Sequence, residues 1–424
     1  MSTITFIASG TRGDVQPAVA LGKALHQRGH TVRILAGANF ADWIRQHGLL
    51  PLPTQIDMQA LMASEGGRDW VEKGHNPVLQ LRIMSQLLAK HGMQIARDAW
   101  AACQGSDLII SSFTSDVYAV GMAQKLGIPH LSAPLQPTMF STKDGRVLLN
   151  APLPNRISRI NDWFGKLFIE TAAWSLYGDI ANRVRTEMLG LPAQTRAENR
   201  EDRRKMTIIH GYSPHVVPHP ADWPDNFHTA GYWFLDEHDQ WQPSGDLLNF
   251  LGAGAPPVAI GFGSMTGRNP EKMNNLVLAA VQMSGRRAIL LSGWAGLGNR
   301  QLPGSVLQLP SAPHSWLFPK MAAVVHHGGA GSTAAGLRAG VPSILVPHFA
   351  DQPFWGQRVA ALGVGPKAIL RNKLTAHKLA EAIDTAVSSA LSNQSMRQKA
   401  AELGQKIRAE DGIGRAVALI EQAL

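Results

Sequence analysis

The chain is poor in cysteine and in long apolar runs. Its single cysteine, Cys103, excludes an intramolecular disulfide and a zinc site built from several cysteines, so we expect a reducing compartment and a cytoplasmic chain. Glycine, proline and charged residues interrupt every apolar run before it reaches the roughly 18 residues that a membrane-spanning helix requires. The first residues enter a strand pattern without a basic segment or a long apolar stretch, so no export signal is expected.

Several motifs of metal and nucleotide chemistry are also missing. The sequence has no Asp-x-Asp triplet, which metal-dependent sugar transferases use, and its glycine-rich turn has no Walker A lysine. The histidines of the N-terminal half have no spacing typical of metal ligands. We therefore expect neither a metal site nor a bound cofactor.

Acidic residues are outnumbered by basic ones. Forty lysines and arginines against 31 aspartates and glutamates give a formal net charge of +9, which favours anionic partners. The basic residues are mixed with acidic ones, as between Arg196 and Lys205, and no nucleic-acid-binding module is recognisable. We expect anionic lipid headgroups or a phosphorylated small ligand rather than nucleic acid. The sequence leaves the oligomeric state open.

What the chain does have is length and a regular alternation. At 424 residues it suits two domains of roughly 200 residues each, and 45% hydrophobic residues can supply two cores. Strand-like apolar runs alternate with helical patterns, which predicts an α/β fold with parallel sheets covered by helices. Strands are predicted at 3–8, 31–36, 107–111, 128–132, 258–262, 287–292, 306–309, 322–325 and 341–346, and helices at 17–28, 117–126 and 270–283.

Proline marks the boundary between the two domains. Five prolines between Ser213 and Gly245 suit an extended connector rather than the interior of an element. An aromatic-rich run, 134–191, is interpreted as an insertion that covers a ligand, although each aromatic alone equally suits a core. We predict an N-terminal domain at 1–220, a linker at 221–245, a C-terminal domain at 246–395, and a final helix at 396–424 that packs back on the N-terminal domain.

A strand, a glycine-rich turn and a helix follow one another between Ala322 and Ala339. Glycines let the backbone approach an anion, and the free N–H groups and dipole of the helix favour negative charge at its start. His327, Ser332 and Thr333 can add hydrogen bonds to phosphate oxygens without a metal, so the turn suits a diphosphate. Alternatively, the glycines serve tight packing and the hydroxyls cap the helix.

The next strand argues against a dinucleotide site. Such a site requires Gly-x-Gly-x-x-Gly and an acidic residue roughly 20 residues later, whereas this chain has Pro347 and His348 at that point. Asp351 and Gln352 follow, and a carboxylate beside an amide can bind several hydroxyls of a sugar. The alternative for this pair is a turn followed by a helix cap.

These residues carry a specific resemblance. The run VVHHGGAGSTAAGLRAGVPSILVPHFADQPFWG, residues 324–356, resembles the donor-binding signature of family 1 glycosyltransferases of the GT-B fold. It is especially similar to sterol 3-beta-glucosyltransferases and to bacterial transferases that glycosylate antibiotics. The likeness extends to Pro313–Pro319, Gly261–Met265 and Gly10–Pro17, and so covers most of the chain.

The resemblance implies two facing doubly wound, Rossmann-like domains with a cleft between them. The N-terminal domain would bind the acceptor, with Trp163 and Trp174 as candidate contacts, and the C-terminal domain would bind the nucleotide sugar. The donor-binding residues carried over by position are Gly13, Ser264, Ala312, Pro313, His327, Gly329, Gly331, Ser332, Thr333, Asp351 and Gln352.

Asp14 is the candidate general base. It lies in the loop after the first strand, and the Gly-Asp pair there resembles the sterol and antibiotic branches of the family. A carboxylate that takes the proton of the acceptor hydroxyl implies a single displacement with inversion and no covalent intermediate. As a bare sequence feature, Asp14 also suits a helix cap or an ion pair. Asp116 lies near the same edge, where it would support the site or cap a helix.

One position departs from the plant members of the family. They carry a glutamate that holds the ribose, whereas this chain has Ala335. Bacterial relatives share the small residue, and some of them use deoxythymidine sugars. A uridine donor is the first expectation, with a deoxythymidine donor as the alternative.

The sequence therefore predicts a metal-independent, inverting glycosyltransferase. It would move a hexose, glucose from UDP-glucose in the first instance, to a hydroxyl of a sterol, lipid, polyketide or flavonoid acceptor. One alternative is a nucleotide-sugar epimerase of the same fold, which product analysis distinguishes. Another is a non-catalytic nucleotide-sugar or lipid sensor, which predicts binding without turnover.

The basic composition and an apolar acceptor together predict peripheral attachment at the inner face of the membrane. We expect the protein to sediment with anionic liposomes at low salt and to be released as salt screens the attraction. Neutral liposomes are the control. Absence of sedimentation with anionic liposomes at low salt contradicts this prediction.

Overall fold

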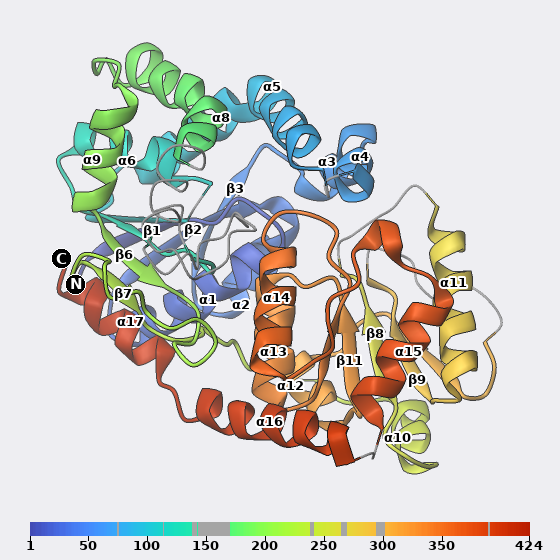
Figure 1. The fold of residues 1–424 in the computed structure, drawn as a ribbon. Helices are drawn as coiled ribbons and strands as arrows, with labels where there is room; N and C mark the ends of the chain where they lie inside the picture. Colours follow the sequence, from blue (N-terminus) through green and yellow to red (C-terminus); the bar gives the residue numbers. More distant parts are fainter. Residues whose placement is uncertain are drawn as a thin grey trace. The chain divides into compact units, whose positions relative to one another are not determined.

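The computed structural model describes residues 1–73, 76–112, 114–137, 142, 170–237, 241–263, 269–293, 302–388 and 391–424. The chain forms two compact units (Figure 1). The first consists of residues 1–61, 81–235 and 410–424, and the second of residues 62–80 and 236–409. Of the residues predicted to form the site, Trp163 and Ser264 lie outside the described residues, as does most of the aromatic run at 134–191.

The first unit is built on a parallel sheet. Its strands lie in the order β3-β2-β1-β4-β5-β6-β7, and each pairs in parallel with its neighbours. A parallel sheet is covered on both faces, which explains strands such as β4, whose four residues are all buried. The strands are β1 Thr3–Ile7, β2 Thr31–Gly37, β3 Leu50–Thr54, β4 Leu108–Ser111, β5 His130–Ser132, β6 Thr207–His210 and β7 Phe227–Thr229.

Helices cover the two faces of this sheet with separate apolar clusters. Leu108 and Ile110 of β4 belong to the cluster that contains residues of α1 and α17, whereas Ile109 belongs to the cluster that contains residues of α5, α6 and α8. This alternation follows from the two-residue repeat of a strand. The helices of this part of the chain are α1 Arg12–Gln27, α2 Ala41–Gln46, α3 Met58–Ala63, α5 Pro77–Cys103, α6 Asp116–Leu126, α8 Glu170–Arg183, α9 Arg196–Lys205 and α17 Gly412–Glu421, with a π-helical turn at Val184–Met188.

The first helix begins earlier than the sequence pattern predicts. We predicted a start at Pro17, but α1 begins at Arg12, with Thr11 as its N-cap. The backbone N–H and the hydroxyl of Thr11 donate to Oδ2 of Asp14 at 2.8 and 3.2 Å, which fixes the first turn. Asp14 therefore lies in the first helical turn and not in the preceding loop.

Part of the predicted linker at 221–245 is structured. The segment contains the edge strand β7, and Trp223, Trp233 and Leu235 are buried within the first unit. The boundary between the units falls after Leu235, because these apolar side chains join the clusters of the first unit. Proline-rich composition predicted an extended connector, but it did not show that the segment contains a strand and packs against a core.

The second unit has a smaller parallel sheet in the order β10-β9-β8-β11-β12. In Figure 1, α11 and α15 lie side by side, and contacts between them support that arrangement. The strands are β8 Val258–Gly261, β9 Ala288–Leu291, β10 Val306–Leu309, β11 Ala323–His326 and β12 Ser343–Leu345. The helices are α4 Glu65–Lys73, α10 Gly245–Gly252, α11 Pro270–Ser284, α12 His314–Leu317, α13 Ala330–Ala339, α14 Gln352–Leu362, α15 Ala376–Val387 and α16 Leu391–Arg408.

The C-terminal segment, predicted as one helix at 396–424, is divided between two helices. Only α17 joins the first unit, where it packs against α1, and α16 stays with the second. Gly340, at the end of α13, has φ +73°, and a Cβ there would lie 3.2 Å from Cα of Ala401 in α16. α16 therefore packs closely on α13. Both helices belong to the second unit, which ends at Ala409.

None of the described helices combines the length and the apolar character that crossing a bilayer requires.

Buried histidines predict that the protein loses stability in acid. Burial lowers the pKa of His210 and of His348 to about 3, while the same groups in an unfolded chain titrate near 6.5. Below pH 6.5 the unfolded state therefore binds more protons than the folded state, so stability is full above pH 6.5 and falls as pH decreases towards 3. We expect each group to contribute up to about 1.4 kcal/mol per pH unit in that window.

Urea unfolding between pH 8 and pH 5 tests this prediction. His210→Gln should make the free energy of unfolding less dependent on pH, and His377→Gln, at an exposed position in α15, is the matched control. A stability that does not change between pH 7 and pH 5 contradicts the prediction.

Candidate functional site

The strand order of the second sheet reverses between β8 and β11. The chain runs outward from β8 to β9 and β10, and then returns to β11 on the other side of β8. Open α/β sheets bind ligands where the strand order reverses in this way. In the register, His326 of β11 pairs with Gly261 of β8, so the turns after these two strands leave the sheet side by side.

The turn after β11 is short and depends on glycine. Gly328 has φ +90°, and a Cβ there would lie 3.0 Å from Cδ2 of Leu345 and 3.4 Å from Cβ of Gln352. Gly329 is the N-cap of α13, and a Cβ added at Gly331 would meet no atom within 4 Å. The start of α13 is therefore open beside Gly331, while the turn itself contacts the start of α14.

Two histidines lie at this turn, and each has one ring nitrogen without a hydrogen-bond partner among the described residues. Nδ1 of His326 accepts from the N–H of Gly328 at 3.1 Å, so Nε2 carries the proton, and this Nε2 is buried. Nδ1 of His327 is also buried without a described partner. Burial lowers the pKa of His327 to about 4, aided by nearby His314, so both rings are neutral at pH 7. Neutral imidazoles can hydrogen-bond an anion without a metal.

His327 lies against the N-cap of α13, and Ser332 and Thr333 follow in the first turn of that helix. A Cβ at Gly329 would lie 2.5 Å from Nε2 of His327, so this position must be glycine for the ring to lie where it does. Thr333 is fully buried, and its hydroxyl also has no partner among the described residues. Ser332 is half-buried in the same helical turn. Buried polar groups are normally satisfied, so these atoms are candidates for hydrogen bonds to a group from outside the described residues.

Hydrogen bonds between its own residues and the start of α14 hold the loop before α14. Oε1 of buried Gln352 accepts from the N–H groups of His348 and Phe349 at 2.8 and 3.3 Å. Oδ2 of Asp351 accepts from the indole N–H of Trp355 at 2.7 Å, and Ala350 has a positive φ of 54°. Gln352 therefore lies next to the glycine-rich turn, and its side-chain oxygen holds the loop before α14 rather than facing outward.

Other predicted positions differ in their surroundings. Pro313 is the N-cap of α12, and Ala312 packs against the apolar cluster that contains Leu247 and Leu317. Ala335 packs against the same cluster. A small residue at 335 therefore serves packing in α13, in addition to leaving no carboxylate for a ribose.

Asp14 lies at the corresponding edge of the first sheet. The strand order of that sheet reverses between β1 and β4, and Asp14 follows β1. Its carboxylate folds over Gly10, where a Cβ would lie on Oδ2 itself. Although Asp14 and the neighbouring Gly13 are exposed, the protein around the carboxyl desolvates it and raises the pKa of Asp14, against the lowering effect of the Thr11 hydrogen bonds. Trp174, in α8, is half-buried and covers Gly178.

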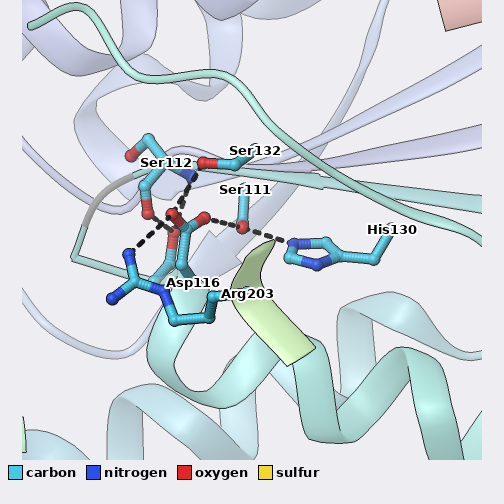
Figure 2. A network of polar contacts seen from close by, with 7 residues as sticks. Ser111, Ser112, Asp116, His130, Ser132 and Arg203 are labelled. Atoms are coloured by element: carbon cyan, nitrogen blue, oxygen red, sulfur yellow. Dashed lines mark hydrogen bonds and ion pairs between the residues drawn. The ribbon is translucent and has the colours of Figure 1, made fainter. Parts of the chain in front are cut away.

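The structure contains a second polar cluster at this edge, whose residues were not predicted to lie together (Figure 2). Asp116 is fully buried, and its carboxylate accepts from the hydroxyls of Ser111 at 2.5 Å and Ser132 at 2.6 Å, with Arg203 at 3.9 Å. Ser111 and Ser132 are paired in the register at the ends of β4 and β5. His130 reaches the Ser111 oxygen at 2.7 Å; because that hydroxyl donates to Asp116, Nε2 of His130 carries the proton.

This cluster anchors the loop that follows β4. Asp116 begins α6, and its N–H donates to the carbonyl of Ser112, while the hydroxyl of Ser115 reaches the carbonyl of Ile7 in β1. Burial lowers the pKa of His130 to about 4 although Asp116 opposes the shift. We predicted two possible roles for Asp116, support of the site or a helix cap, and in the structure it is fully buried at the start of α6.

Within the described ranges, no three side chains from histidine, cysteine, aspartate and glutamate gather closely enough to hold a metal ion.

Two models of known protein families match this chain, one in each half of it. A model of the glycosyltransferase family 28 N-terminal domain matches residues 4–121, and a model of the erythromycin biosynthesis protein CIII-like C-terminal domain matches residues 277–414. The sterol 3-beta-glucosyltransferase of Aspergillus oryzae is 36% identical over 433 aligned residues. The chain therefore has the GT-B fold and matches glycosyltransferase-type models at its N-terminal and C-terminal parts.

Solved structures support the GT-B fold. The glycotransferase of kitacinnamycin superimposes with a TM-score of 0.70 at 19% identity and covers 100% of this chain and 99% of its own. The glycosyltransferase VinC, solved in complex with dTDP, has a TM-score of 0.64 at 19% identity over 99% of each chain. The alignment with the Aspergillus relative covers 99% of this chain but 30% of the relative's length.

The buried cluster around Asp116 predicts a large loss of stability when its carboxylate is removed. Asp116→Ala would leave two buried hydroxyls without an acceptor and Arg203 without its counter-charge, at a cost of about 2–4 kcal/mol. Asp116→Asn keeps the shape and one acceptor oxygen, so a smaller loss of about 1–2 kcal/mol is expected.

Urea unfolding at pH 7 measures these losses. Asp42→Ala, at an exposed carboxylate that pairs with Arg45, is the matched control and should change stability by less than about 0.5 kcal/mol. If Asp116→Ala is as stable as this control, the cluster does not hold the loop.

Proposed function

We propose that the chain is a glycosyltransferase that moves a hexose from a nucleotide sugar to a hydroxyl group of an apolar acceptor. The observation that carries this proposal is the start of α13: the turn before it holds two neutral histidines, each with a buried nitrogen that has no described partner, and Gly331 is exposed with open space where a Cβ would lie. The donor's diphosphate would satisfy these atoms and would also interact favourably with the helix dipole. The matches to the two glycosyltransferase-type models support the same reaction class.

The sugar would lie beside the loop before α14. The turn and the start of α14 are in contact through Gly328 and Gln352, so a hexose joined to the diphosphate is within reach of Asp351. One carboxylate oxygen of Asp351 is held by Trp355, which fixes the orientation of the other. A fixed carboxylate can accept hydrogen bonds from two neighbouring sugar hydroxyls, which favours a hexose.

Asp14 would take the proton of the acceptor hydroxyl. Oδ2 is fixed by Thr11, so Oδ1 is the oxygen that would receive the proton. The attacking oxygen then forms its bond to the anomeric carbon as the bond to the diphosphate breaks, and the configuration inverts. Because desolvation raises the pKa of Asp14, activity should fall with decreasing pH sooner than it would with an ordinary aspartate.

The donor nucleotide is proposed to be uridine diphosphate, with deoxythymidine diphosphate as the alternative. Ala335 packs into an apolar cluster and provides no carboxylate for a ribose, which reduces discrimination between the two sugars. VinC, of the same fold, was solved with dTDP, which keeps the alternative open to test. We propose no metal requirement, because neutral histidines and helix N–H groups suffice as phosphate donors.

A sterol is the first acceptor to test. The relative from Aspergillus oryzae is a sterol 3-beta-glucosyltransferase, and its similarity extends over 99% of this chain. Lipid and polyketide-like acceptors are the alternatives. A chain of this family that senses nucleotide sugars without turnover would bind the donor and form no product.

Product formation from radiolabelled UDP-glucose or dTDP-glucose with sterol, flavonoid and lipid acceptors tests the proposal. We expect a glycoside of inverted configuration, with the same rate in the presence of EDTA. Asp14→Asn should lower kcat by at least about 100-fold, the usual range for loss of a general base, without changing donor affinity. Asparagine keeps an acceptor for Thr11, so the start of α1 should persist.

Asp42→Asn, an exposed aspartate of the same unit, is the matched control and should retain full activity. Donor binding without any glycoside would favour the sensor, and full activity of Asp14→Asn would remove the assigned base. A changed sugar in the absence of acceptor would instead identify an epimerase.

A further inference from the structure

Helix α4 belongs to the second unit although the chain on both sides of it belongs to the first. The helix is locally well defined, because the hydroxyl of Ser64 accepts from the N–H of Gly67 at 3.2 Å and so caps its start. Val71 is buried, and Trp70 is half-buried. A short segment between two stretches of the first unit is therefore an integral part of the unit that carries the donor site.

Trp70 stacks on the loop that carries Asp351. Its ring lies 4.7 Å from the ring of Phe349, centroid to centroid, with an angle of 28° between the planes. Phe349 is buried, and its N–H is one of the two groups held by Gln352. Stacked aromatic pairs stabilise a structure by more than the area that they bury predicts. The stack therefore holds Phe349, which lies two residues before Asp351, in place.

The same helix also places a charge beside this loop. Arg371 is partly desolvated, which lowers its pKa, and Glu72 opposes that shift. The N–H of Arg371 donates to the carbonyl of Pro347 at 3.0 Å, at the beginning of the loop. Trp70 of α4 thus contacts the segment from Pro347 to Asp351 directly, and Glu72 interacts with Arg371, whose backbone binds the first residue of that segment.

The indole N–H of Trp70 is a hydrogen-bond donor that the described residues leave unsatisfied. Nε1 is buried and has no hydrogen-bond partner among the described residues. Trp223 and Trp233 also bury an indole nitrogen without a described partner, but both lie in apolar clusters of the first unit. Trp70 differs because its ring lies against the proposed sugar loop. A buried N–H without an acceptor is costly, and a hydroxyl of a bound sugar would remove that cost.

We propose that Trp70 is a specificity-determining residue for the transferred sugar, and that its indole N–H donates to a sugar hydroxyl while its ring holds the loop of Asp351 in place. This inference rests on the proposed function. It makes a separate claim: α4 recognises the sugar and not the nucleotide. The nucleoside diphosphate alone should therefore bind equally well with or without Trp70.

Isothermal titration of UDP-glucose and UDP, and of dTDP-glucose and dTDP, tests this claim on the full chain. Trp70→Phe keeps a ring for the stack but removes the N–H, and should weaken nucleotide-sugar binding by roughly 3- to 10-fold with no change for the diphosphate. Trp70→Ala removes the stack as well and should weaken sugar binding further. Trp100→Phe, in α5 of the first unit, is the matched control and should bind like the original protein.

The outcomes separate the two proposals. If the original protein binds no nucleotide sugar and no diphosphate, the proposed function fails, and the role of Trp70 fails with it. If the original protein binds the sugars and Trp70→Phe matches it, only the role of Trp70 is overturned. An equal loss for sugar and diphosphate would also overturn it, because that result indicates a general structural effect.

Discussion

The glycine-rich turn between β11 and α13 is the constraint on which the second unit depends. A helix has to begin almost directly after a buried strand, so the backbone reverses through Gly328 at a positive φ with Leu345 and Gln352 against it. That geometry directs helix N–H groups outward from the sheet edge and fixes the two histidines beside them. The loop before α14 is in turn held against this turn, which brings the Asp-Gln pair to the same place.

Polar groups are buried at both sheet edges, but they are satisfied in different ways. Around Asp116 the cluster is closed, since each carboxylate oxygen accepts from a serine hydroxyl. Around His327 and Thr333 the described protein leaves buried atoms without partners. Because an unmade buried hydrogen bond costs about 1–3 kcal/mol, the first arrangement stabilises the fold, and the second is the place where we propose that the diphosphate binds.

Local patterns predicted much of this architecture. The apolar runs at β1, β2, β4, β8, β9, β10 and β11 coincide closely with observed strands, because most of their residues are buried, as in β4, β9 and β11. The edge strand β3 escaped prediction because Pro51 and Pro53 interrupt its pattern, and an edge position tolerates them. The start of α1 was misplaced because the reciprocal Thr11–Asp14 cap outweighs the signal of Pro17.

By itself, the sequence determined the α/β class, the strand-turn-helix order around His327, and the resemblance to GT-B glycosyltransferases, because all of these lie in contiguous residues. Tertiary structure alone decided that Gln352 directs its oxygen to its own loop, that Asp116 is closed in by Ser111 and Ser132, and that Trp70 lies on Phe349. These contacts join side chains through the packing of separate elements, and no local periodicity encodes which side chains will meet.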